Sequence, residues 1–294
     1  MFFADIQVPA SSTGGQESVF ADDLSVFKKF DRFVSNDEIS RDMHVCRVRV
    51  HKWGRVNRVE FDPGKEHVII LHPIDGAGDP FKLLGCLFDC KLLMNQAVDK
   101  ILSQVRPKVK AILRTRQHYD AKDLIFQFKT HVWGIMEIHN GGLFHAASYL
   151  LAKFDSVQNH FLHEIGMTTS DAFLEFNFAP PTLRRNIGVL GLIHKRVLGN
   201  AHPVFQQLLP FFNDVFGYPR PGHDKQLYGH ILDVQFQLTL YKRSIFGMVD
   251  VYNTLPQELV DLNTVQKFQT ELTKIARIRC QAGAANWEFS FAGR

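Results

Sequence analysis

The sequence predicts an α+β fold, in which a small head of β-hairpins and one helix precedes a mostly α-helical body. Three observations indicate this fold class. Near the N-terminus, short apolar runs alternate with turn residues, which is typical of hairpins. After Asp89, apolar residues recur at intervals of three and four, the period of an amphipathic helix. Hydrophobic residues make up 45% of the 294 residues and charged residues 22%, so a packed core is expected.

The head is predicted to begin with a tight hairpin over residues 18–27, where two apolar runs flank the acidic pair Asp22 and Asp23. This pair is expected at the hairpin tip. A helix is predicted over 37–51, because the apolar positions there keep a helical spacing. Short strands are predicted at 67–71 and 81–84, each after a turn that contains Gly and Pro.

The body is predicted to begin with a long amphipathic helix after Asp89. Its apolar stripe consists of Val98, Ile101, Leu102, Val105, Val109 and Ile112. Pro107 is expected to kink this helix. Further helices are predicted over 120–138, 146–165 and 181–198, the last of which ends at Gly199. Past Phe211 the pattern is less regular, because Gly and Pro interrupt it.

Composition excludes several classes of protein. No window approaches 18 uncharged apolar residues, so a membrane partner is not expected. The N-terminus reaches Asp5 without a basic segment, and the four cysteines are scattered. We therefore expect an intracellular protein of the nucleus or cytoplasm that is not secreted. A net charge of +4 permits nucleic-acid binding but does not imply it.

The adjacent carboxylates of Asp22 and Asp23 are the sharpest chemical feature of the sequence. Carboxylates at a hairpin tip can share a pair of divalent cations, and such a pair stabilises the attacking and leaving oxygens of phosphoryl transfer. The alternative is a plain acidic turn, since Asp is common in turns. On this dipeptide alone, the plain turn is favoured.

A series of segments, taken in order, resembles the reverse transcriptases of non-LTR (LINE-type) retrotransposons. The family has an aromatic-Ala-Asp-Asp hairpin, an Asn…Lys segment and a Phe-Lys-Tyr-Leu-Gly hairpin, and residues 20–23, 57–65 and 81–85 are similar to these. Three helical signatures of the family follow: Leu…Asp-x-x-Gln, Leu-Arg-Arg and Arg-Ser-x-Phe…Trp-Asn-x-Leu-Pro. Residues 150–162, 181–195 and 243–256 are similar to them. The series extends over nearly the whole chain.

The resemblance implies a fold and an activity. The fold would be the C-terminal part of a polymerase palm over 1–88, a thumb-like helical region over 89–165 and a helical C-terminal region over 166–294. The activity would be that of an RNA-directed DNA polymerase, a nucleotidyltransferase whose partners are an RNA template and a DNA primer.

The resemblance also implies roles for residues of the head. Asp22 and Asp23 would be catalytic and would bind Mg²⁺, and Lys65 would be catalytic as the cation that steadies the departing pyrophosphate. A solvated lysine after a Pro-Gly turn is the alternative for Lys65. A primer grip would be formed by Phe81, Lys82, Leu84 and Gly85, with a strand packed on the palm as the plain alternative.

A basic run lies on the long helix predicted after the palm. It consists of Arg106, Lys108, Lys110, Arg114 and Arg116. In a thumb, this run would bind the phosphate backbone of an RNA–DNA duplex, whereas the alternative is a solvated helical face. A second basic set, comprising Arg184, Arg185, Lys195 and Arg196, is expected at the surface more often than against nucleic acid.

Two departures from the family pattern limit the activity expected. Only 21 residues precede Asp22, too few for the fingers and for the strand that carries the first catalytic carboxylate, and position 83 is Leu where the family has Tyr. We therefore expect a retrotransposon polymerase fragment that is inactive by itself. The alternatives are a non-catalytic RNA or RNA–DNA binding module and a degenerate interaction protein.

Overall fold

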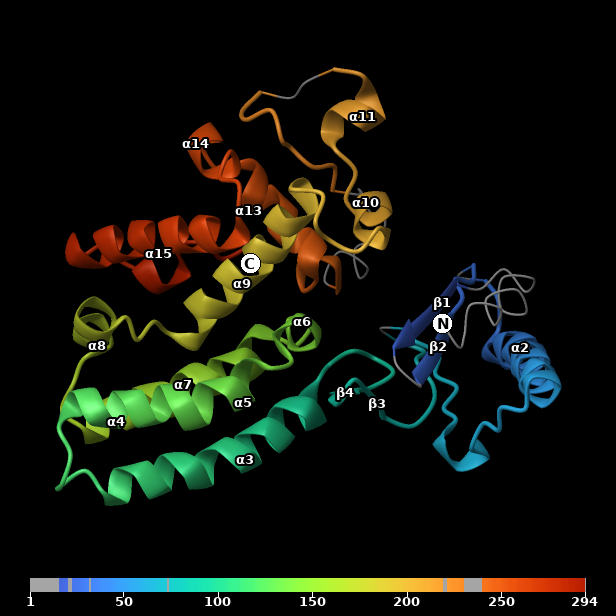
Figure 1. The fold of residues 1–294 in the computed structure, drawn as a ribbon, viewed down its shortest axis with the longest axis horizontal. Coiled ribbons are helices and arrows are strands. Elements are labelled where there is room, and N and C mark those ends of the chain that lie inside the picture. The colour runs from blue at the N-terminus through green and yellow to red at the C-terminus, as the bar shows by residue number, and fades with distance from the viewer. Residues whose placement is uncertain are drawn as a thin grey trace. The chain divides into compact units, whose positions relative to one another are not determined.

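The computed structural model describes residues 16–20, 23–31, 33–72, 74–218, 221–229 and 240–293. It confirms an α+β chain, mostly helical, with two small antiparallel hairpins (Figure 1). The chain divides into an N-terminal unit, residues 1–81, and a C-terminal unit, residues 82–294. The predicted boundary at 88 lies close to this division, whereas the predicted boundary at 165 falls inside the C-terminal unit. The palm and thumb assignments stay predictions.

The N-terminal unit contains the predicted hairpin and the predicted helix. Strands β1 (Gln16–Phe20) and β2 (Asp23–Phe27) pair antiparallel, and Phe20 lies opposite Asp23. Helix α2 (Asn36–Asn57) follows. The Ser35 hydroxyl accepts the N–H of Glu38 at 3.3 Å, and the Glu38 carboxylate accepts the N–H of Ser35 at 3.0 Å. This reciprocal capping box fixes where the helix begins.

The core of the N-terminal unit is small. Among the hydrophobic side chains described there, only Ile39 and Cys46 are buried. The predicted strand at 67–71 was wrong in extent: after the 3₁₀ turn Pro63–Lys65, the run forms a single bridge between Ile70 and Ala77.

A second hairpin marks the division between the units. Strands β3 (Phe81–Leu83) and β4 (Cys86–Phe88) pair across a two-residue loop, Leu84 and Gly85. The strand predicted at 81–84 is confirmed except for Leu84, which belongs to the loop. Both loop residues have positive φ, 48° and 83°. Two-residue hairpin loops favour this conformation because its twist matches that of the strands.

The first core of the C-terminal unit lies among its early helices. They are α3 (Asn95–Arg114), α4 (Ala121–Phe128), a π-turn (Lys129–Trp133), α5 (Gly134–Glu137), α6 (Asn140–Leu143) and α7 (Ser148–Glu164). All six predicted stripe residues of α3 are buried, and the helix continues through Pro107. The helices predicted over 120–138 and 146–165 are also confirmed. Phe128 packs against Phe161 and Phe178 in this core.

A second core lies among the later helices of the same unit. They are α8 (Thr169–Phe176), α9 (Pro181–Val197), α10 (Val204–Leu208), α11 (Phe212–Phe216), the 3₁₀ turn Ile245–Met248, α13 (Val249–Asn253), α14 (Gln257–Val260), α15 (Val265–Gln281) and the 3₁₀ turn Trp287–Phe289. Helix α9 begins at the predicted residue and ends one residue before the predicted end, and Gly199 has a φ of 73°. The prediction of a less regular tail missed α15, which packs along α9 (Figure 1). Among the helices described, none is long and apolar enough to cross a membrane.

Candidate nucleic-acid interface

The residues expected to carry catalysis lie in the N-terminal unit. Asp23 is exposed at the start of β2, and Asp22 lies outside the described residues. Lys65 ends the 3₁₀ turn and is highly exposed, with its Nζ 3.9 Å from a carboxylate oxygen of Asp62. In the part of the chain that the structure describes, no three His, Cys, Asp or Glu residues gather where they could hold a metal ion. The Mg²⁺ site implied for Asp22 and Asp23 stays a prediction, because Asp22 lies outside the described residues.

The predicted grip residues lie on and around the second hairpin. Phe81 and Lys82 belong to β3, while Leu84 and Gly85 form its loop. Lys82 and Leu84 are exposed at the surface. A Cβ at Gly85 would lie 3.2 Å from the imidazole of His139, so the loop packs closely against the chain before α6. This placement is compatible with both alternatives for the hairpin, a primer grip and a strand that packs on its neighbours.

The basic run of α3 separates into residues that share a face and residues that do not. Arg106, Lys110 and Arg114 recur every four residues and are exposed along one flank of the buried stripe. Lys108 is exposed on the other flank, since each residue turns the helix by about 100°. Arg116 lies past the helix end, 3.8 Å from a carboxylate oxygen of Glu164.

The three aligned cations of α3 border two grooves. One, of about 320 Å³, lies between α3 and α7, with Arg106 and Lys110 on one wall and Lys153 and His160 on the other. A second, of about 450 Å³, extends along α3 past Pro107 to Arg114. Lys153 also lies 3.0 Å from Asp99. Within the described residues, Arg106, Lys110 and Arg114 form no ion pair. The flank thus offers unneutralised cations beside an indented surface.

The surface position expected for the second basic set is confirmed for Lys195, which is exposed, and was wrong for Arg185 and Arg196. Arg185 and Arg196 are buried, 4% and 6% exposed, and Arg184 is half-buried. Sequence could not show this, because the aromatic rings that cover them come from other segments: the Arg185 guanidinium lies 5.8 Å from the ring of Phe154, and that of Arg196 lies 4.1 Å from the ring of Phe211. Neither arginine is available to a nucleic acid.

Residues of the α7 and α9 motifs join these two helices. Asp155 accepts the backbone N–H of Thr182 at 2.9 Å and its hydroxyl at 2.6 Å, at the start of α9. The fully buried Gln158 accepts the indole N–H of Trp133 at 3.1 Å and donates to the Ala179 carbonyl at 3.0 Å. In this chain these motif positions are therefore structural.

Neighbouring arginines on α9 are expected to respond oppositely to removal of their charge. Arg184 forms a two-point ion pair with Glu137, with its Nη2 2.7 Å from Oε2, and its guanidinium lies 3.5 Å from the ring of Trp133. Within the described residues Arg185 has no hydrogen bond, and burial lowers its pKa, although Asp155 and Glu137 oppose this. We expect Arg184→Met to lower the free energy of unfolding by about 2 kcal/mol, since it leaves Glu137 unpaired.

Arg185→Met is expected to leave the free energy of unfolding unchanged or to raise it by about 1–2 kcal/mol, because it removes a poorly compensated buried charge. Urea denaturation followed by circular dichroism measures both variants. Equal destabilisation by the two substitutions would contradict the assignment of a paired charge to Arg184 and of a poorly compensated charge to Arg185.

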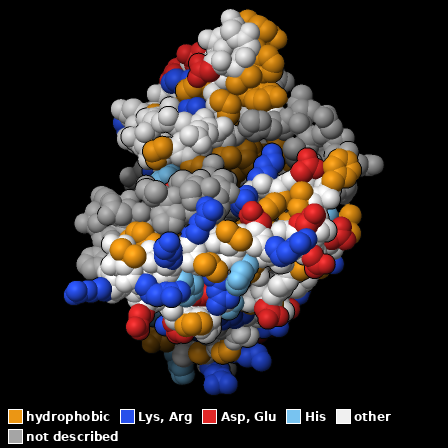
Figure 2. Space-filling model, turned by 90° about the vertical axis from the view of Figure 1, so that its right-hand side faces the viewer, with side chains coloured by type: hydrophobic (Ala, Val, Ile, Leu, Met, Phe, Trp, Pro, Cys, Tyr) orange, Lys and Arg blue, Asp and Glu red, His pale blue; other side chains and the backbone are white. Residues whose placement is uncertain are grey.

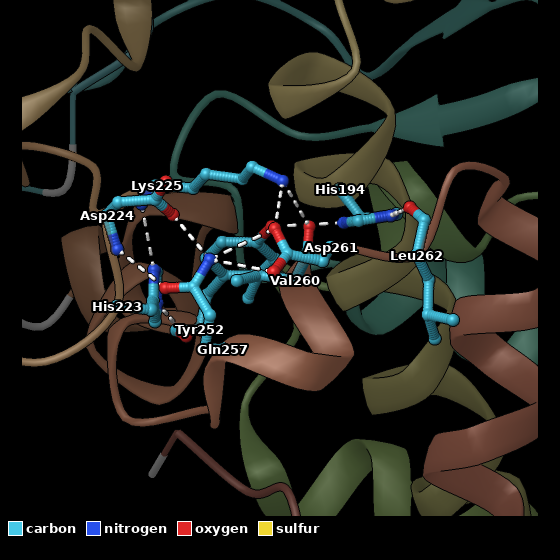
Figure 3. A network of polar contacts seen from close by, with 9 residues as sticks. All are labelled: His194, His223, Asp224, Lys225, Tyr252, Gln257, Val260, Asp261 and Leu262. Atoms are coloured by element: carbon cyan, nitrogen blue, oxygen red, sulfur yellow. Dashed lines mark hydrogen bonds and ion pairs between the residues drawn. The ribbon is translucent and has the colours of Figure 1, made fainter.

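A buried histidine, missed in the sequence, anchors α9 to the segment that precedes α15 (Figure 3). His194 is fully buried, and its ring stacks on Phe268 with 4.2 Å between centroids. Its Nε2 lies 2.7 Å from the Leu262 carbonyl and its Nδ1 3.0 Å from the Tyr252 hydroxyl. Because a carbonyl only accepts, Nε2 carries the proton and Nδ1 accepts from Tyr252. Burial lowers the pKa of His194, so the ring is neutral.

A second buried histidine contacts the same tyrosine. His223 donates from Nε2 to the Tyr252 carbonyl at 3.1 Å and accepts the backbone N–H of Lys225 at its Nδ1, also at 3.1 Å. Burial lowers the pKa of His223, and it raises the pKa of the Tyr252 hydroxyl above its usual range. Both ring nitrogens of His194 and both of His223 thus have a hydrogen-bond partner, and these partners suit a neutral imidazole.

An ion pair borders this histidine network on its exposed side (Figure 3). The Lys225 ammonium donates to the Val260 carbonyl at 3.1 Å and to Asp261 at 2.5 Å. Hydrogen bonds from Lys225 and Gln257 lower the pKa of the Asp261 carboxyl. The arrangement links three segments of the second core, which indicates a structural role.

Comparison of the chain with protein-family models, with curated proteins and with solved structures found no match.

Proposed function

We propose that this chain binds an RNA–DNA duplex along α3, as the thumb-like part of a non-LTR retrotransposon reverse transcriptase. One observation carries the proposal: Arg106, Lys110 and Arg114 form an exposed line of cations with no ion-pair partner among the described residues. The line extends over about 12 Å at 1.5 Å per residue, enough to contact two or three neighbouring phosphates.

The groove between α3 and α7 supports the same ligand. Its second wall carries Lys153 and His160, so a phosphate backbone lying in it would meet nitrogen donors on both sides. Arginine suits this role, because its planar guanidinium donates two parallel hydrogen bonds to a phosphate. Val109 and Val157 line the groove between the polar groups, where sugar carbons could pack.

Polymerase chemistry is a separate step that the α3 surface does not require. In the intact family reaction, Asp22, Asp23 and a third carboxylate would hold Mg²⁺ while Lys65 steadies the leaving group. A non-catalytic RNA–DNA binding module would need only the cations of α3. The polymerase and the non-catalytic module would therefore both bind the duplex through α3. This binding is the part of the proposal that the described side chains support.

Neutralising the three aligned cations tests the proposal. We expect the triple variant Arg106→Gln, Lys110→Gln and Arg114→Gln to bind a 20-base-pair RNA–DNA hybrid about 30-fold more weakly at 0.1 M salt. The slope of log affinity against log salt should fall in magnitude by about 2.7, since each lost phosphate contact releases about 0.9 fewer counterions. Fluorescence anisotropy at 50 and 200 mM salt measures both quantities.

A matched control changes the same net charge elsewhere. Lys267, Lys274 and Arg279 are exposed on α15, and their replacement by Gln should change affinity by less than about threefold. Folding should survive in both variants, because exposed charges contribute little to stability. An equal loss in the two variants, or none in either, would exclude α3 as the binding surface.

A further inference from the structure

The outer face of α2 carries three exposed cations and two exposed valines, which the function proposed above does not use. Its members recur at spacings of four, three, four and three residues, so they share one face of the helix. They are Arg41, Val45, Val48, Lys52 and Arg55, and all five are exposed. We refer to them as the α2 outer face. The opposite side carries the buried residues Ile39, Cys46 and Gly54.

We propose that the α2 outer face is a binding surface for the phosphate backbone of nucleic acid. Lys52 and Arg55 form no ion pair within the described residues, and Arg41 donates only to the Asp37 carbonyl, at 3.3 Å. The charge of Lys52 and Arg55 is thus available to an anion. From Arg41 to Arg55 the face extends over about 21 Å at 1.5 Å per residue, a length beside which one strand of a duplex carries about six phosphates.

The acidic groups around the helix offset the charge of the face only at Arg41. Hydrogen bonds from Ser35 lower the pKa of the Glu38 carboxyl and the charge of Arg41 adds to this, while Asp37 lies four residues before Arg41 on the same face. Asp42 lies 2.6 Å from the Lys28 ammonium, on the flank of the helix. Glu66 pairs with Arg47 and His51 on the other flank. Glu38 takes part in the capping box, where its carboxylate accepts from Ser35. From residue 43 to the helix end, α2 contains no acidic residue at all.

The apolar members of the face favour a nucleic acid over a lipid surface. Val45 and Val48 are each about half exposed, 48% and 49%, but valine is short and cannot reach into acyl chains. Helices that lie in a membrane interface use Trp, Phe and Leu for that purpose, and the α2 outer face has none of these. Figure 2 faces the N-terminal unit and shows Lys and Arg side chains interspersed with hydrophobic and acidic ones rather than bordering one apolar patch.

This proposal does not rest on the binding proposed for α3. The two helices belong to different units of the chain, and each surface is complete without residues of the other. A variant of either helix therefore leaves the second surface intact, and the failure of one proposal can be told apart from the failure of the other.

The test uses the full chain with Arg41, Lys52 and Arg55 replaced by Gln. We expect affinity for a labelled 20-base-pair RNA–DNA hybrid to fall about tenfold at 0.1 M salt, with a smaller salt slope. The α15 triple variant again serves as the control of equal charge, and circular dichroism checks that each variant is folded.

Three results would overturn the proposal. The first is unchanged hybrid affinity and salt slope in the folded α2 variant. The second is an equal loss in the α15 control, which would make the effect one of net charge alone. The third is a variant that keeps its affinity for the hybrid but loses binding to vesicles containing 30% phosphatidylserine, which would assign the face to a lipid surface.

Discussion

Replacing His194 with alanine is expected to lower the free energy of unfolding of the C-terminal unit by about 3–5 kcal/mol. The ring is fully buried and stacks on Phe268, so its removal leaves a cavity in the second core. It also leaves the Tyr252 hydroxyl and the Leu262 carbonyl without their partner, and each buried unsatisfied group costs about 1–3 kcal/mol. Urea denaturation followed by circular dichroism measures the loss.

An exposed histidine of the same unit provides the matched control. His163 lies in the last turn of α7, and we expect His163→Ala to change the free energy of unfolding by less than about 1 kcal/mol. The double variant His194→Ala and Tyr252→Phe should lose less than the sum of its parts, because the two side chains share one hydrogen bond. Strict additivity would show that this bond contributes nothing.

Acid is expected to destabilise the C-terminal unit through the two buried histidines. Both have a pKa that burial lowers below the ordinary 6.5, so the unfolded chain binds more protons than the folded one once the pH falls below about 6.5. The stability that neutral His194 and His223 contribute is fully present above that pH and is lost as the pH falls. With two groups, the loss can reach about 2.7 kcal/mol per pH unit.

Denaturation midpoints measured between pH 7.5 and 5 check this dependence. His223→Gln removes one titrating group, so its curve should fall about half as steeply below pH 6.5 as that of the original protein. The Gln amide nitrogen can still donate to the Tyr252 carbonyl, which keeps the variant folded. A curve that stays flat down to pH 5 in the original protein would contradict the protonation states assigned to the network.

Much of the fold could be predicted, because most of its elements carry a strong local period. The stripe of α3 recurs every three or four residues, and Pro181 and Gly199 mark the two ends of α9. Helix α15 was missed because two positions of its buried line, Ala276 and Cys280, are small and weaken the apolar signal. The strand predicted at 67–71 failed for another reason: a strand needs a partner, and pairing is not a local property.

The candidate site could be predicted in part for the same reason. The basic run of α3 was evident, and helical spacing already separates Arg106, Lys110 and Arg114 from Lys108. Burial of Arg185 and the network of His194 were not predictable, because Tyr252 and Leu262 lie 58 and 68 residues from His194 along the chain. The cations of α2 recur with a helical period, but valines occupy two of the positions on the same face. The sequence therefore shows no continuous basic run there.

The uneven distribution of buried side chains has a consequence for proteolysis. In the described part of the N-terminal unit, hydrophobic burial is limited to Ile39 and Cys46, whereas the C-terminal unit has two cores. Regions with few buried contacts open at a low free energy, and proteases cleave the opened state. Trypsin should therefore remove the arginine-rich α2 first and leave a resistant product that begins near Lys82, the first residue of the C-terminal unit.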